Sequence, residues 1–151
     1  MMNPQQLLDR AIEIATIAHA GMVDKAGKPY IDHPRRVMAH LTSPEEKMAA
    51  VLHDVVEDTQ VSLEVLVEAG FSSPVVAAVD ALTKRDGEEV EAYYQRVIAN
   101  PVALRVKIAD MHDNLDLFRI ESPTQKDADR IGRYCAIYPK LVQALIDTQK
   151  Y

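Results

Sequence analysis

Apolar positions along the chain recur mostly at intervals of three and four residues, which is the spacing of one face of an α-helix. The repeat is clearest near the two ends of the chain, in Leu8, Ala11, Ile12, Ala15 and Ala18 and in Leu141, Val142, Leu145 and Ile146. Strand-like alternation is nearly absent. The one ambiguous stretch, LRVKIAD at 104–110, follows Pro101 and continues a helical stripe to Leu115. The pattern therefore predicts an all-α fold.

Prolines mark several expected helix starts. Five of the eight follow Asn or Ser, at Asn3-Pro4, Ser43-Pro44, Ser73-Pro74, Asn100-Pro101 and Ser122-Pro123. An Asn or Ser side chain accepts an otherwise unpaired amide proton at a helix N-terminus, and proline fits the first helical position. His33-Pro34 resembles a sixth start, and SPEE at 43–46 predicts a capping box in which Glu46 reaches back to the cap.

These starts predict a compact bundle of about seven helices. The segments between them, at 21–32, 58–62, 84–88 and 119–123, are expected to be loops that wall a site. A chain of 151 residues with 48% apolar content has the size of a single domain with its own core, so one domain over 1–151 is expected.

The amino-acid composition limits the kinds of partner and the cellular location that we expect for the protein. The net charge of −6 argues against a nucleic-acid polymer or an anionic membrane as the main partner, although small anionic ligands remain compatible with a local cluster of bases or a metal. The lone Cys135 cannot form an internal disulfide, and acidic residues occupy the region where a signal peptide would be apolar. A cytoplasmic protein is the expectation. The sequence leaves the number of subunits open.

The stretch AAVLHDVVEDTQ at 49–60 carries four titratable groups at the end of an apolar run. On a continuous helix His53 would lie over Glu57, and Asp54 over Asp58. An ordinary interpretation is a solvated helix end with a hydrogen-bonded core histidine. The other interpretation is a metal site, and two further segments bear on it.

GKPYIDHPRRV supplies His33 at a helix start, and VKIADMHDNL supplies Asp110 inside an apolar stripe. An unpaired carboxylate on a buried face costs several kcal/mol, so it requires a cation. Two imidazoles and two carboxylates form a mixed nitrogen and oxygen site that suits Mn, Fe or Zn better than Ca, and that leaves positions for water and substrate.

Four segments together resemble a known family. GKPYIDHP, VLHDVVEDT, ALTKR and VKIADMHDN occur in the order and at the spacing of the HD-domain hydrolases of the RelA/SpoT group, and the chain is similar to the small alarmone hydrolases over almost its whole length. The resemblance implies an all-helical domain with one divalent metal, usually Mn²⁺, that removes the 3′-pyrophosphate from (p)ppGpp-type nucleotides of the stringent response.

The resemblance also implies residue roles. The metal ligands would be His33, His53, Asp54 and Asp110, and the pair that orients or deprotonates the attacking water would be Glu57 and Asp58. The nucleotide contacts would be Lys25, Asn114, Arg130 and Tyr134.

Asp24 departs from the family pattern. An arginine that stacks on guanine usually stands at this position, and replacing it by Asp24 removes the stacking cation and adds a negative charge. Asp24 is therefore expected to touch the base, and nucleotides of the (p)ppApp type are expected to be cleaved at least as well as (p)ppGpp.

Two alternatives stay open from the sequence. One is an HD phosphohydrolase that acts on another phosphorylated nucleotide, for example on the 2′-phosphate of NADPH. The other is a non-catalytic nucleotide-binding protein. Glu57 and Asp58 favour an enzyme, because binding alone requires no pair of water-activating carboxylates.

Overall fold

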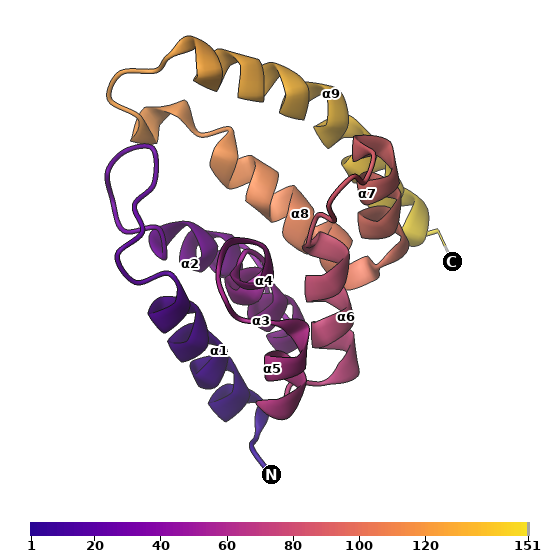
Figure 1. Ribbon diagram of the computed structural model, residues 1–151. Coiled ribbons are helices and arrows are strands. Elements are labelled where there is room, and N and C mark those ends of the chain that lie inside the picture. The colour runs from indigo at the N-terminus through magenta and orange to yellow at the C-terminus, as the bar shows by residue number, and fades with distance from the viewer. Residues whose placement is uncertain (151) are drawn as a thin grey trace.

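The computed structural model describes residues 1–150 as α-helices joined mostly by short loops (Figure 1). The elements are α1 (Pro4–Ala18), α2 (Asp32–Ala39), α3 (Pro44–Leu52), α4 (Val55–Asp58), α5 (Leu63–Glu68), α6 (Ser73–Leu82), α7 (Val90–Ala99), α8 (Pro101–Asn114), the 3₁₀ helix η1 (Leu117–Arg119) and α9 (Gln125–Thr148). Within residues 1–150 the only sheet-like feature is an isolated antiparallel bridge between Val23 and Pro29. The all-α prediction is confirmed, and two short helices, α4 and α5, raise the number above seven.

Several predicted caps form as expected. The Asn3 side chain accepts the amide of Gln6 at 2.9 Å and starts α1. The hydroxyl of Ser43 accepts the amide of Glu46 at 3.2 Å and starts α3. Asn100 accepts two backbone amides at the start of α8, which settles the ambiguous 104–110 stretch as helix.

Other predicted starts are displaced. Helix α6 begins at Ser73 itself, with Ser72 as its cap. Helix α9 begins at Gln125, two residues after Pro123, because Thr124 and Asp127 form a reciprocal capping box there. The Glu46 carboxylate pairs with Arg105 at 3.5 Å instead of completing a capping box.

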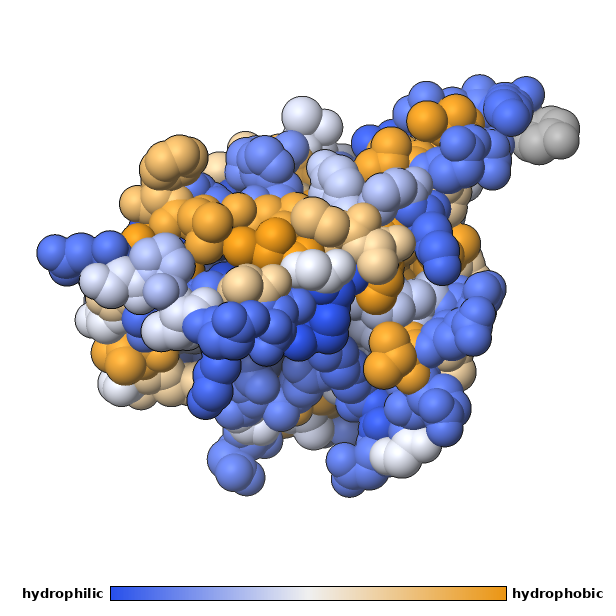
Figure 2. Space-filling model, turned by 90° about the horizontal axis from the view of Figure 1, so that it is seen from above, coloured by the Kyte–Doolittle hydropathy of each residue, from blue (hydrophilic) through white to orange (hydrophobic). Residues whose placement is uncertain are grey.

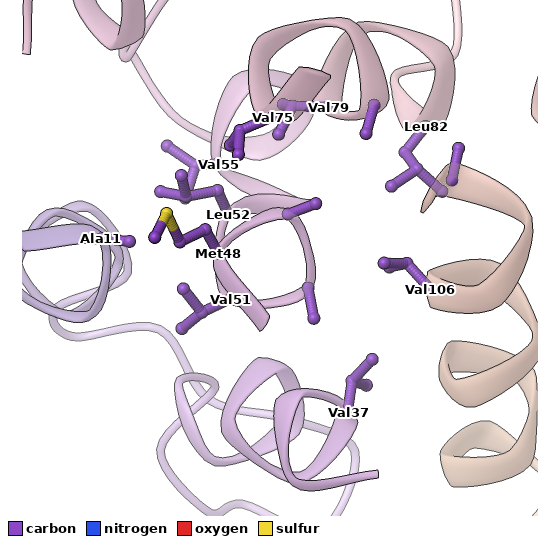
Figure 3. Packing of buried hydrophobic residues seen from close by; sticks show 14 of the residues in the cluster. Ala11, Val37, Met48, Val51, Leu52, Val55, Val75, Val79, Leu82 and Val106 are labelled. Atoms are coloured by element: carbon purple, nitrogen blue, oxygen red, sulfur yellow. The ribbon is translucent and has the colours of Figure 1, made fainter. Parts of the chain in front are cut away.

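Helix α3 forms the centre of the fold. Its residues from Met48 to Leu52 are buried, and α1, α2, α6 and α8 pack around it. Figure 3 shows Met48, Val51 and Leu52 at the middle of this packing. The small side chains of Ala49 and Ala50 are fully buried, so they allow neighbouring helices to approach α3 closely. The two polar residues that follow Leu52 are therefore fixed at the end of the best-packed helix.

A second apolar cluster joins α8 to α9 through Leu104, Met111 and Leu141. On the face seen in Figure 2, hydrophobic side chains form a band with a large hydrophilic area beside it. No helix within residues 1–150 combines the length and the apolar character that crossing a bilayer requires.

Candidate metal centre and active site

The His53-Asp54 step lies between α3 and α4. The prediction of one continuous helix through Asp58 is wrong, since α3 ends at Leu52 and α4 begins at Val55. The Nδ1 atom of His53 turns back to the Ala50 carbonyl oxygen at 2.5 Å, which fixes the imidazole at this break. Beyond the break, the Asp58 amide donates to the Asp54 carbonyl oxygen at 2.9 Å, as in a helix. This hydrogen bond keeps Asp58 one turn beyond Asp54.

Four residues from three segments converge at this point. The Nε2 atom of His33, in the first turn of α2, lies 2.9 Å from Asp110 Oδ1 on α8. The Nε2 atom of His53 lies 3.1 Å from Asp54 Oδ2 and 3.4 Å from Asp110 Oδ1. The structure thus brings together all four residues predicted as metal ligands.

The outer ring nitrogens fix the orientation of both imidazoles. His33 Nδ1 donates to the Asp113 carboxylate at 2.6 Å, and His53 Nδ1 donates to a backbone carbonyl. Each Nε2 is then left with a lone pair that faces carboxylate oxygens, and that of His53 is buried without a hydrogen-bond partner. Lone pairs facing one another are stabilised only by a cation or a proton between them. The donor set therefore fits a divalent metal of the Mn, Fe or Zn type.

Proton affinities show how strongly the cluster attracts positive charge. Burial lowers the pKa of His53, but Asp54 and Asp110 outweigh it and hold that pKa well above its ordinary value. Burial raises the pKa of Asp54, whereas the His53 imidazole lowers it more, to about 2. A metal must displace the imidazole protons to bind, so metal affinity should fall as the pH falls.

Three residues that support the site were not predicted as part of it. The Tyr30 hydroxyl donates to Asp54 Oδ2 at 2.5 Å. Asp113, which orients His33, also pairs with Arg36 at 2.8 Å. The spacing of Asp113, three residues after Asp110 on α8, was a signal that both carboxylates share one helix face. Nothing in the sequence placed Tyr30 against Asp54.

Lys107 balances the charge of Asp110 from the same helix. Its Nζ atom lies 3.0 Å from Asp110 Oδ2, and its side chain is only 8% exposed. Burial lowers the pKa of Lys107, but Asp110 and the neighbouring tyrosines hold it well above its usual value. Lys107 thus occupies one carboxylate oxygen and leaves the other, Oδ1, facing the imidazoles.

Asp113→Ala should weaken metal binding by about 10- to 100-fold, because His33 would lose the acceptor that fixes its ring and raises its basicity. Titration of the metal-free variant with Mn²⁺ measures this change. Asp116→Ala is the matched control, since Asp116 lies near Asp113 and also pairs with Arg119, at 3.7 Å, without touching an imidazole. Equal Mn²⁺ affinities for Asp113→Ala and the wild type would contradict the role.

A cavity of about 320 Å³ opens onto the four converging residues. All residues predicted for the site line it: Asp24, Lys25, His33, His53, Asp54, Glu57, Asp58, Asp110, Asn114, Arg130 and Tyr134. The predicted loops contribute to its wall through Val23, Lys84 and Ile120.

The carboxylates of Glu57 and Asp58 stand at the exposed edge of this cavity. Partial burial, together with the nearby negative charges of Asp54 and Glu57, raises the pKa of Asp58 to about 6. The Oε1 atom of Glu57 accepts the Lys84 amide at 2.9 Å, which ties α4 to the loop after α6. A carboxylate with a pKa near 6 is suited to accept a proton at neutral pH.

Three of the residues predicted to contact the substrate already make hydrogen bonds within the protein. Asn114 donates to both the backbone and the side chain of Asp110, each at 3.0 Å. Arg130 donates to Asp127 at 2.8 Å. Asp24 Oδ1 accepts the amides of Ala26 and Lys28 at 2.8 and 3.0 Å. Asp24 therefore orders the loop that carries Lys25.

An all-helical fold in which a His-Asp step meets a distant histidine and aspartate defines the HD class of metal-binding domain. No family model matches the chain. The sequence is 33% identical to a probable GTP pyrophosphokinase of Mycobacterium leprae over 80% of this chain and 17% of that protein. It is 34% identical to a guanosine-3′,5′-bis(diphosphate) 3′-pyrophosphohydrolase of Vibrio cholerae over 83% of this chain and 20% of that protein.

A solved structure of a metazoan ortholog of SpoT that hydrolyses ppGpp superimposes with a TM-score of 0.72 at 29% identity, covering 96% of this chain and 88% of that one. These matches show that the chain resembles the hydrolase domain of the RelA/SpoT family. It spans about a fifth or less of the length of the curated relatives, at 17% and 20% of the two proteins above.

Proposed function

We propose that the protein is a metal-dependent hydrolase that removes the 3′-pyrophosphate from alarmone nucleotides of the (p)ppGpp or (p)ppApp type. The observation that carries this proposal is the convergence of His33, His53, Asp54 and Asp110, with two unshared imidazole lone pairs, beside a carboxylate of raised pKa. The reported activities of the Vibrio cholerae protein and the metazoan ortholog agree with it.

Mn²⁺ is the proposed metal, with Fe or Zn as substitutes. A divalent ion held by these four side chains would act as a Lewis acid toward phosphoryl oxygens and lower the pKa of water. Asp58, assisted by Glu57, accepts the proton of the attacking water. The oxygen of this water forms a bond to the phosphorus attached to the ribose 3′ oxygen, and the ester bond between that phosphorus and the ribose oxygen breaks. Pyrophosphate leaves carrying the hydroxyl that came from water, and the ribose oxygen takes up a proton.

The remaining residues of the cavity bind and orient the nucleotide. Lys25 and Arg130 provide positive charge for the phosphates, and Tyr134 provides a hydroxyl on the same helix as Arg130. Asn114, held against Asp110, is available to the ribose. These positions fix the 3′ group near the carboxylate pair, which is what an in-line attack requires.

A pyrophosphate-release assay tests the function directly. Purified protein with Mn²⁺ is incubated with ppGpp, ppApp and NADPH, and pyrophosphate and phosphate are measured separately. Pyrophosphate release from either alarmone supports the proposal. Phosphate release from NADPH alone would replace it with the alternative phosphohydrolase, and no turnover of any nucleotide would contradict it.

We propose that Asp24 contacts the base in addition to ordering its loop, and two variants separate these two roles. Asp24→Asn keeps an oxygen that can accept the Ala26 and Lys28 amides, so the loop and KM should stay near normal. If the charge of Asp24 also contacts the base, Asp24→Asn will change the ratio of kcat/KM between ppApp and ppGpp severalfold, and Asp24→Arg will shift it toward guanine. A ratio that neither variant alters would show that other residues choose the base.

A further inference from the structure

A second cavity, of about 580 Å³, adjoins the first. The two cavities share Lys25, Ile120 and Arg130 as lining residues, so these three residues lie at the boundary between them. The rest of the second cavity comes from the segment before α9 and from the first turns of that helix, including Ser122, Thr124, Lys126 and Arg133. Figure 1 shows this segment running into α9 near the loop between α1 and α2.

Positive charge dominates the lining of this second cavity. It contains four cations, Lys25, Lys126, Arg130 and Arg133, against the two carboxylates of Asp127 and Asp129. Asp127 is already occupied by Arg130 at 2.8 Å and by the Thr124 amide at 2.8 Å. None of the ion pairs found within residues 1–150 involves Lys25, Lys126 or Arg133.

Arg130 lies on the boundary between the two cavities and is incompletely paired. It is 5% exposed, and its Nε atom is buried without a hydrogen-bond partner. A buried guanidinium N–H without a partner carries the full cost of its lost hydration, which an acceptor at this position would remove. Its presence on a cavity wall indicates a ligand with oxygen acceptors.

The crowding of the cations agrees with this interpretation. Burial lowers the pKa of Lys25, the charges of Arg130 and Arg133 lower it further, and Asp127 offsets only part of the change. Like charges held together in this way repel one another, and an anion placed among them converts the repulsion into attraction.

We propose that the second cavity binds the phosphate groups of the substrate that are not cleaved, namely the 5′-diphosphate of a nucleotide phosphorylated at both ends. The proposal rests on the proposed function, since it assigns the far end of the same substrate. Lys25 and Arg130 border both cavities, whereas Lys126 and Arg133 are absent from the lining of the first. Lys126 and Arg133 therefore contribute to affinity for the 5′ end and take no part in bond cleavage.

The double variant Lys126→Gln, Arg133→Gln tests this subsite by kinetics. For ppGpp, KM should rise about tenfold or more, because two charge-assisted contacts are lost, while kcat should stay the same. For guanosine 3′-diphosphate, which has a free 5′ hydroxyl, both constants should stay the same. Lys140→Gln is the control, since it removes a positive charge from an exposed position of α9 that lines neither cavity.

Calorimetric binding of GDP separates failure of the subsite from failure of the function. GDP carries the 5′-diphosphate but no cleavable group, so its Kd should rise about tenfold or more in the double variant and stay the same in Lys140→Gln. If wild-type protein cleaves no nucleotide, the proposed function fails, and the GDP comparison still decides the subsite. An unchanged GDP Kd, or an equal rise of KM for ppGpp and guanosine 3′-diphosphate, would overturn the subsite.

Discussion

Asp54→Ala is expected to lose its divalent metal and about 10²- to 10³-fold or more of its activity. Asp54 supplies one of the two carboxylates at the centre, and its Oδ2 lies 3.1 Å from His53 Nε2. Without Asp54, three protein ligands remain for the metal, and the site loses one negative charge. Loss of Lewis-acid stabilisation of several kcal/mol corresponds to that rate change.

Elemental analysis and pyrophosphate release on the same preparation check this expectation. Asp9→Ala is a suitable control, because Asp9 is an exposed carboxylate on α1 far along the chain from the centre. Helical circular dichroism establishes that both variants are folded. A folded Asp54→Ala protein that retains the metal content of the wild type would refute the ligand assignment.

The double variant Glu57→Gln, Asp58→Asn is expected to lose about 10²-fold or more of kcat, the usual scale for removing a positioned base. Folding should be little affected, because both side chains are exposed. Glutamine also keeps an oxygen that can accept the Lys84 amide, which Glu57 now accepts at 2.9 Å. Metal content should match the wild type, and near-normal kcat in the folded variant would exclude these residues as the base.

The raised pKa of Asp58 adds a pH dependence. A pKa of about 6 means that Asp58 is protonated, and unable to accept a proton, in increasingly acidic solution, so kcat should fall as the pH drops through that region. A bound cation shifts this limb to lower pH. Asp58→Asn should remove this contribution to the limb.

The raised pKa of Asp58 gives folding stability a pH dependence opposite to that of kcat. A carboxyl pKa above its unfolded value means that the folded state binds the proton more tightly, so this contribution is present at low pH and is lost as the pH rises through about 6. In metal-free protein at pH 7 to 8, Asp58→Asn should therefore melt at or slightly above the wild-type temperature. A clear decrease in Tm would show that Asp58 supports the fold.

The sequence alone predicted most of the local structure. Helix type follows from apolar spacing, and the starts at Asn3, Ser43 and Asn100 follow from capping side chains beside prolines. Both signals lie within a few residues of the structure they specify. The residues predicted as metal ligands were selected in the same way, because His33, the His53-Asp54 pair and Asp110 each lie in a short recognisable segment.

Tertiary structure decided how those segments meet and what their environment does to them. Asp113 reaches His33 across 80 positions of sequence, and Tyr30 reaches Asp54 across 24. The break between α3 and α4, the displaced start of α9 and the raised pKa of Asp58 likewise depend on neighbours that no local window contains. Local backbone preferences can be read from adjacent residues. Burial and electrostatic coupling depend on distances in space, which only the packing of α3 against its neighbours sets.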